Sequence, residues 1–182
     1  MKKRRKSLGF TLVEVMMAMV ILTVGLLALL ALFAQAVATM QVAQEDQIAK
    51  QKAREALESV YSARNDTSIS YASIQNVSNG GIFKDGFQPL YLPGANGVAG
   101  TVSDTSTLDR IITPGNDGLM GTADDVVLPL SNYRRQIAIS PVYLADGSVN
   151  PNMRKLVVTV QVFSPGRGTR NYSVSGYISR FP

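Results

Sequence analysis

The fold of this chain is decided by residues 7–34, which read SLGFTLVEVMMAMVILTVGLLALLALFA. Within this stretch, the 25 residues from Phe10 to Ala34 carry a single charged side chain, that of Glu14. A helix rises about 1.5 Å per residue, so this run is roughly 37 Å long and exceeds the ~30 Å hydrocarbon core of a bilayer. The run therefore predicts a transmembrane helix. Because a carboxylate inside such a helix is costly, Glu14 is expected to have a specific partner.

A basic leader precedes the apolar run. Residues 2–6 are all Lys or Arg, and GFTLVE follows at residues 9–14. Together with the apolar run, this pattern resembles the type III signal sequence of type IV pilins and pseudopilins. The resemblance implies that a prepilin peptidase cleaves after Gly9, that Phe10 becomes the N-methylated mature N-terminus, and that Glu14 is the fifth mature residue.

The resemblance also implies a role for Glu14 in assembly. In the family's assembly model, the glutamate of an incoming subunit meets the terminal amine of a subunit already in the filament. Opposite charges attract strongly at low dielectric, and each reduces the desolvation cost of the other. We therefore hypothesise that Glu14 pairs with the Phe10 amine of another copy. The leader cations should hold the N-terminus in the cytoplasm, which places the rest of the chain outside.

The alternative to this interpretation is a membrane-anchored, extracytoplasmic ligand-binding domain on an uncleaved signal anchor, with Glu14 at the level of the headgroups. A conventional secretory signal is disfavoured because the run is longer than a 7–15-residue apolar segment. Unlike many major pilins, the chain has no proline between Phe10 and Arg64. The ILTVGLLAL stretch at 21–29 is similar to minor pilins of the pilus-modification type, which favours a minor subunit.

Composition limits the possible functions. The five basic residues of the leader account for all of the net charge of +5, so a nucleic-acid-binding surface is not favoured. Histidine and cysteine are absent from the sequence, which excludes histidine-based catalytic triads, most zinc sites and disulfides. Because the sequence shows no recognisable combination of a nucleophile and a base, we expect no enzymatic activity and no small-molecule substrate.

The helix is expected to continue from residue 35 to about residue 65, because this segment lacks Gly and Pro. Two charge pairs at helical spacing, Asp46 with Lys50 and Arg54 with Glu58, add minor support. Glu45, with the other glutamates of this segment, is interpreted as solvated. An apolar stripe should pack on a sheet, and it consists of Ile48, Ala49, Ala53, Ala56, Leu57, Val60 and Tyr61.

The remainder, residues 66–182, is predicted to be a globular head. Residues 66–108 are rich in Ser, Gly, Asn and Asp and are expected to form the variable loop region. Within 109–182, alternating apolar residues predict strands at 133–143, 155–163 and 169–178, joined by short turns. The expected fold class is α+β, with a long N-terminal helix packed on an antiparallel sheet of three or four strands, as in pilins.

One segment of the head is acidic and rich in glycine. Residues 113–125, TPGNDGLMGTADD, contain Asn116, Asp117, Asp124 and Asp125. Calcium prefers six to eight oxygen ligands on a bendable loop, which these side chains could supply, although the spacing does not match an EF-hand. The other interpretation, which we favour, is a plain Asp/Gly turn without any cofactor.

Two adjacent arginines, Arg134 and Arg135, begin a predicted strand and could offer DNA a basic spot. Adjacent residues of a strand point to opposite faces, so we interpret the pair as a solvated strand edge.

The sequence thus predicts four parts: a cleaved leader at 1–9, a transmembrane and filament-core helix at 10–34, its amphipathic continuation at 35–65 and an extracytoplasmic head at 66–182. We expect a structural subunit of a type IV pilus or pseudopilus, first inserted in the bacterial inner membrane and then assembled in a surface pilus or periplasmic pseudopilus. Its expected partners are other pilin subunits, the prepilin peptidase and the assembly platform.

Overall fold

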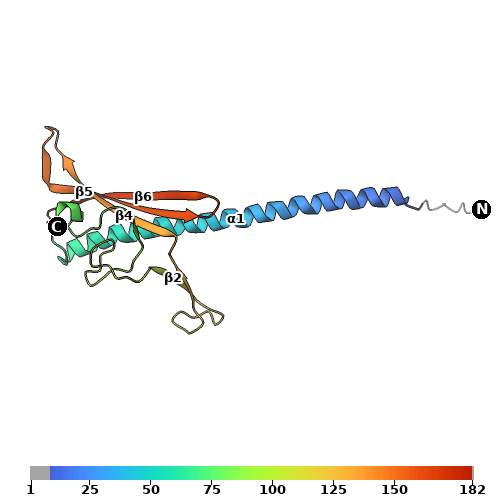
Figure 1. Cartoon of the computed structure of the whole chain (residues 1–182), viewed down its shortest axis with the longest axis horizontal. Helices are drawn as coiled ribbons and strands as arrows, with labels where there is room; N and C mark the ends of the chain where they lie inside the picture. Colours follow the sequence, from blue (N-terminus) through green and yellow to red (C-terminus); the bar gives the residue numbers. More distant parts are fainter. Residues whose placement is uncertain (1–8, 182) are drawn as a thin grey trace, which may run out of the picture. The chain divides into compact units, whose positions relative to one another are not determined.

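The computed structural model of the chain describes residues 9–181 (Figure 1). A single helix, α1 (Leu12–Asn65), confirms the long helix predicted from the sequence. The chain divides into two compact units, one ending at Gln44 and one beginning at Glu45. The second unit, which is called the head from here on, therefore contains the last part of α1 in addition to the predicted head, and it includes all of the described strands.

The end of α1 lies where the helix-forming residues stop. The amide of Asp66 still donates to the carbonyl of Ser62, and the amide of Ile69 returns to the carbonyl of Ala63. Thr67 adopts a left-handed conformation with φ of 63°. The Asp66 carboxylate then accepts a hydrogen bond from the amide of Ser68 at 2.9 Å, which stabilises the turn.

The main sheet of the head has four antiparallel strands in the order β1-β4-β5-β6. The fold class and the number of strands are those expected from the sequence. The strands are β1 (Gln88–Pro89), β4 (Tyr133–Tyr143), β5 (Val149–Ser164) and β6 (Gly168–Ser179). Short turns join β4 to β5 and β5 to β6, so these three strands form a meander along the second half of α1 (Figure 1).

The core of the head lies between α1 and one face of this sheet. The helix buries a row of small residues, namely Ala49, Ala53, Ala56, Val60 and Ala63. The facing strand β5 buries Leu156, Val158, Val160 and Val162 at alternate positions. Small side chains on the helix allow the two elements to approach closely, and the alternation turns every second strand residue towards the helix. The apolar stripe predicted on the helix is confirmed.

The outer edge of β4 is covered in two ways. Strand β1 pairs only with Arg134 and Arg135. Further along, the side-chain amide of Asn76 donates to the carbonyl of Ile137 at 2.8 Å and accepts from the amide of Ile139 at 2.9 Å. A buried side chain thus replaces a neighbouring strand and satisfies backbone groups that would otherwise lack partners.

Residues 110–129 do not join the main sheet, which differs from the single sheet expected over 109–182. They contain β2 (Arg110–Thr113) and β3 (Val126–Pro129), which pair with each other as a separate two-stranded sheet. This hairpin stands off from the main sheet (Figure 1). Its base is held by hydrogen bonds from the amide of Asp109 to the carbonyl of Leu90 and from the amide of Leu130 to the carbonyl of Asp109.

Candidate functional site

The start of α1 carries the residues that the sequence singled out for processing. Gly9 and Phe10 precede the helix, and the side chain of Phe10 is 82% exposed. Thr11 caps the helix, because its hydroxyl accepts a hydrogen bond from the amide of Glu14 at 3.3 Å and its carbonyl accepts from Val15 at 3.3 Å. The peptide after Gly9 therefore lies in an exposed, non-helical segment.

Glu14 occupies the first turn of α1, three residues beyond the capping Thr11. A Thr followed by Glu at this spacing is the sequence of a capping box, and a carboxylate in the first turn interacts favourably with the helix dipole. The spacing of Thr11 and Glu14 alone indicates this local role, which is additional to the predicted role in assembly. Glu14 also borders an open apolar depression on the helix, lined by Phe10, Glu14, Val15, Ala18, Met19 and Leu22.

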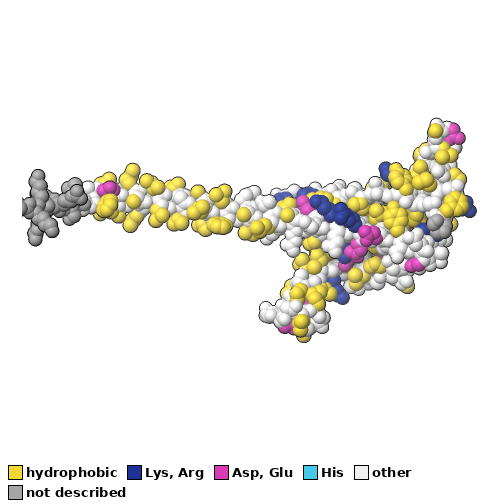
Figure 2. Space-filling model, turned by 180° about the vertical axis from the view of Figure 1, so that it is seen from behind, with side chains coloured by type: hydrophobic (Ala, Val, Ile, Leu, Met, Phe, Trp, Pro, Cys, Tyr) yellow, Lys and Arg dark blue, Asp and Glu magenta, His cyan; other side chains and the backbone are white. Residues whose placement is uncertain are grey.

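The first half of α1 exposes apolar side chains on all sides. Every residue from Leu12 to Val37 is exposed, and the first buried residue is Ala49. Figure 2 shows hydrophobic side chains covering this part of the helix on the visible face, with acidic atoms only near its start. By its length and composition, α1 could cross a membrane. The leader predicted at residues 1–9 lies outside the described residues except for Gly9.

The acidic loop between β2 and β3 uses its carboxylates to hold its own backbone. Asp117 accepts from the amide of Leu119 at 2.8 Å, and Asp125 accepts from the amide of Gly121 at 2.7 Å. Asp124 accepts from the hydroxyl of Thr122 and the amide of Asp117, and these hydrogen bonds lower its pKa. The aspartates of this segment therefore stabilise a folded turn, which explains why the segment is rich in Asp.

The structure brings Asp117 and Asp124 together across this loop, whereas Asp125 contacts the amide of Gly121. Among residues 9–181, no group of three or more carboxylates has an arrangement that could hold a metal ion. Calcium binding at Asn116, Asp117, Asp124 and Asp125 stays a prediction.

The two adjacent arginines point to opposite faces of β4, as expected, but the solvated edge predicted for both is wrong for Arg135. Arg134 is exposed, whereas the side chain of Arg135 is only 5% exposed. Burial lowers the pKa of the Arg135 guanidinium, and the charge of Asp104, with Nη2 at 3.7 Å from its carboxylate, opposes this shift. The buried side chain of Arg135 is therefore not accessible to a nucleic acid.

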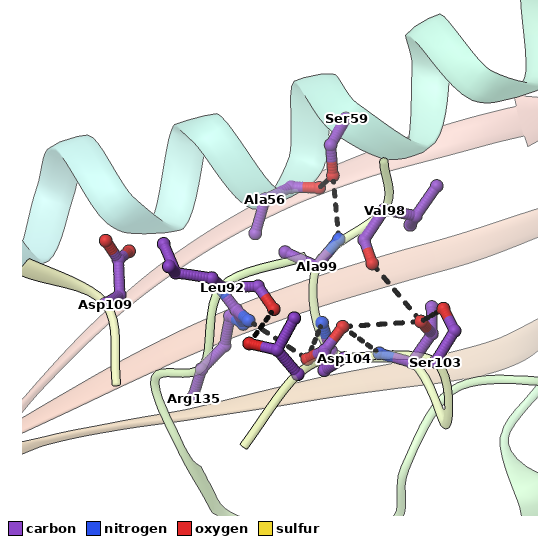
Figure 3. Close-up of polar contacts among 12 residues, drawn as sticks. Ala56, Ser59, Leu92, Val98, Ala99, Ser103, Asp104, Asp109 and Arg135 are labelled. Atoms are coloured by element: carbon purple, nitrogen blue, oxygen red, sulfur yellow. Dashed lines mark hydrogen bonds and ion pairs between the residues drawn. The ribbon is translucent and has the colours of Figure 1, made fainter. Parts of the chain in front are cut away.

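Asp104 also organises the loop that covers Arg135 (Figure 3). Its carboxylate accepts from the amides of Gly100 at 2.8 Å and Thr101 at 3.2 Å, and from the hydroxyl of Thr101 at 3.3 Å. The same loop is joined to α1, since the amide of Ala99 donates to the hydroxyl of Ser59 at 3.4 Å. Residues from α1, the loop and β4 thus form one buried polar cluster, which serves the fold.

A second cluster ties α1 to β6. Arg170 contacts Glu45 at 2.6 Å and Asp46 at 3.0 Å, and the hydroxyl of Ser164 donates to Glu45. Burial raises the pKa of Glu45, but the hydrogen bonds from Ser164 and Arg170 outweigh burial and lower it. Two predictions from the sequence are therefore wrong: Glu45 is not simply solvated, and Asp46 pairs with Arg170 rather than with Lys50. Lys50 lies instead over the ring of Tyr172, 5.5 Å from its centroid.

Comparison with known proteins gives one match. Residues 4–30 match the family model described as the prokaryotic N-terminal methylation motif, and this range includes Gly9, Phe10 and Glu14. Searches of curated proteins and of solved structures found no match. The chain thus carries a prepilin-type N-terminal methylation motif at the start of a long apolar helix, consistent with a type IV pilin-like protein.

Proposed function

We propose that this chain is a minor structural subunit of a type IV pilus or a related pseudopilus. The observation that carries the proposal is the methylation motif at residues 4–30, placed directly on a helix whose apolar side chains are exposed from Leu12 to Val37. A soluble protein rarely exposes so continuous an apolar surface, which needs lipid or other apolar helices around it. A pilin-like subunit is surrounded by lipid while it is in the membrane and by other apolar helices once it is in the filament.

In this proposal, the basic leader first keeps the N-terminus in the cytoplasm while α1 spans the inner membrane. A prepilin peptidase then cleaves after Gly9, where the exposed, non-helical peptide is accessible to a protease. Cleavage creates a cationic amine at Phe10, which is then methylated. The minor assignment follows from the similarity of residues 21–29 to minor pilins, and such subunits prime or decorate a filament.

Assembly then depends on the pairing of Glu14 with the Phe10 amine of another copy. The apolar depression beside Glu14 supports this proposal, because it leaves space for a neighbouring helix next to the carboxylate. In a low-dielectric environment an unpaired carboxylate is costly, so a partner amine would favour the assembled state over the single subunit in the membrane.

The proposal is tested by following Glu14→Gln from the membrane to the filament. The neutral variant keeps the shape of the side chain, so it should still be inserted and processed, yet it should be absent from sheared filaments or the isolated pseudopilus. Thr11→Ala is the matched control for the capping role: a loss of incorporation equal to that of Glu14→Gln would show that the glutamate acts only at the helix start. Normal incorporation of Glu14→Gln would refute the pairing.

A further inference from the structure

A hollow with both polar and apolar walls lies on the head where the β4–β5 hairpin bends. It encloses about 440 Å³, within the range of small-molecule sites. Its walls come from the loop around η1 (Val77–Asn79), the end of β4 and the beginning of β5. The residues that line it are Tyr71, Gln75, Asn79, Ile139, Ser140, Pro141, Val149, Asn150, Pro151, Met153 and Arg154.

The hollow exists because the strand pairing is interrupted. Pro141 pairs with Arg154, but the next residue, Val142, pairs with Asn150, so residues 151–153 have no partners on β4. Proline cannot donate to a strand ladder and is common at bulges, and the bulge here contains Pro151. The tip of the hairpin consequently bends away from the main sheet (Figure 1), which opens a concave surface beside it.

Arg154 is held rigidly in the wall of this hollow. Its Nη1 donates to the carbonyls of Tyr71 at 2.6 Å and Ile74 at 2.5 Å. Its guanidinium carbon also lies 4.3 Å from the centroid of the Tyr71 ring. These three contacts fix the plane of the guanidinium, so little conformational entropy remains to be lost when a ligand binds.

The other edge of this guanidinium is available. Nη1 uses both of its hydrogens on the two carbonyls, which leaves the N–H groups of Nε and Nη2. Over residues 9–181, these atoms donate no hydrogen bond and no carboxylate forms an ion pair with Arg154. The paired donors of Nε and Nη2 match the two oxygens of a carboxylate.

The remaining walls are neutral. Three primary amides, those of Gln75, Asn79 and Asn150, and the hydroxyl of Ser140 line the hollow. The side chain of Gln75 already donates to the carbonyl of Ala72, and that of Asn150 already accepts from the amide of Asn152. The side-chain amide of Asn79 forms no hydrogen bond within residues 9–181, whereas its backbone amide donates to the carbonyl of Asn76. Amides and hydroxyls pair well with sugar hydroxyls, and Ile139 and Met153 add apolar surface suited to the C–H face of a sugar ring.

We propose that this hollow binds a sugar acid, with the carboxylate on Arg154 and the hydroxyls on the surrounding amides. A single cation with no second positive side chain in the lining fits a singly charged carboxylate better than a doubly charged phosphate. The site belongs to the head alone, so it is independent of the proposed assembly through α1.

The test uses the full chain in detergent, with ¹³C-methyl labels on Met and Ile so that Met153 and Ile139 report on the hollow. Sodium glucuronate should shift both methyl signals in a saturable way, whereas acetate should bind at least about tenfold more weakly because it lacks the hydroxyls. Glucose should bind at least about tenfold more weakly than glucuronate because it lacks the carboxylate. Inorganic phosphate should bind no more tightly than acetate.

Variants distinguish the site from unspecific binding. Arg154→Gln should lower the glucuronate affinity about tenfold or more, with Arg134→Gln, an exposed arginine outside the lining, as the matched control. If Arg154→Gln does not fold, the variant Asn79→Ala provides the test. The Asn79 side chain makes no hydrogen bond within residues 9–181, so its loss should leave the fold intact and weaken binding about threefold or more. Absence of a saturable shift, equal binding of glucose or acetate, tighter binding of phosphate, or unchanged affinity in Asn79→Ala would overturn the proposal.

Discussion

At the scale of single residues, the buried pair of Asp104 and Arg135 is asymmetric. Asp104 supports two backbone amides and the hydroxyl of Thr101, in addition to facing Arg135. Arg135 is only 5% exposed, and its Nε is buried without a hydrogen-bond partner. The carboxylate therefore organises the loop, while the guanidinium is costly to bury.

Removal of the two partners should consequently have unequal effects. We expect Asp104→Ala to lower the free energy of unfolding by about 3–5 kcal/mol, because it leaves a buried guanidinium without its charge partner. Arg135→Met should cost distinctly less, since the Asp104 carboxylate keeps its hydrogen bonds from Gly100 and Thr101. Denaturant unfolding of the full chain in detergent measures both, and an equal or larger loss for Arg135→Met would contradict this assignment.

Glu45 makes the stability of the head depend on pH. Its pKa in the folded chain lies below the ordinary value of 4.5, so the unfolded chain takes up the proton first as the pH falls. The stabilisation from Glu45 is thus complete above pH 4.5 and is lost as the pH falls through the folded pKa. Wild type should be more stable than Glu45→Gln at pH 7, and the difference should narrow below pH 4.5.

Thermal unfolding of both proteins from pH 7 to pH 3 tests this expectation. Glu58→Gln is the matched control, because this glutamate makes no ion pair within residues 9–181. A difference that stays constant or widens on acidification would show that Arg170 and Ser164 do not stabilise the ionised form.

At the scale of elements, the contact between α1 and β6 depends on a missing side chain. A Cβ added at Gly176 would overlap the hydroxyl of Tyr61, which itself donates to the carbonyl of Tyr177 at 3.2 Å. Glycine therefore allows the tyrosine of the helix to lie against β6 and to reach the carbonyl of the next residue on that strand.

This close approach predicts a coupled pair of variants. Gly176→Ala should lower the free energy of unfolding by about 1–3 kcal/mol through overpacking, and Tyr61→Phe by about 1 kcal/mol through loss of the hydrogen bond. The double variant should lose less than the sum, because removal of the hydroxyl makes room for the new methyl group. Strictly additive losses in a double-mutant cycle would mean that the two residues do not touch.

The elements differ in how far the sequence predicts them. Long periodic segments such as α1 and the central part of β5 are defined by their own residues, and both were predicted. Strand β1, with only two residues, has no periodicity of its own and depends on its pairing with β4. The separation of β2 and β3 from the main sheet cannot be predicted from the sequence either, because the local residue pattern of these strands is compatible with both sheets.

The candidate sites show the same division between local and distant information. Gly9, Phe10 and Glu14 could be proposed from the sequence because the motif is continuous, and the capping by Thr11 follows from the same residues. The partners of Glu45 and Arg135 lie on other elements, so no local sequence pattern predicts them. The Arg154 hollow depends on a bulge whose register the sequence does not reveal.

At the scale of the whole molecule, the two compact units predict separable behaviour. Within residues 9–181, all of the buried core residues lie at or beyond Ala49, and the second unit begins at Glu45. A fragment starting at Glu45 should therefore be soluble without detergent and should unfold in one cooperative transition. Circular dichroism during heating measures this, and a fragment that precipitates or melts without cooperativity would show that the core needs the first part of the chain.

The most direct test of the proposed pilin-like function is the mass of the N-terminal peptide of the mature protein, isolated from cells that contain the matching assembly system. We expect a peptide that begins with N-methylated Phe10, one methyl group heavier than the sequence mass. In the same cells lacking the prepilin peptidase, the chain should still begin with its basic leader. A protein that retains Met1 and the basic leader in the presence of the peptidase would contradict the proposed processing and pilin-like function.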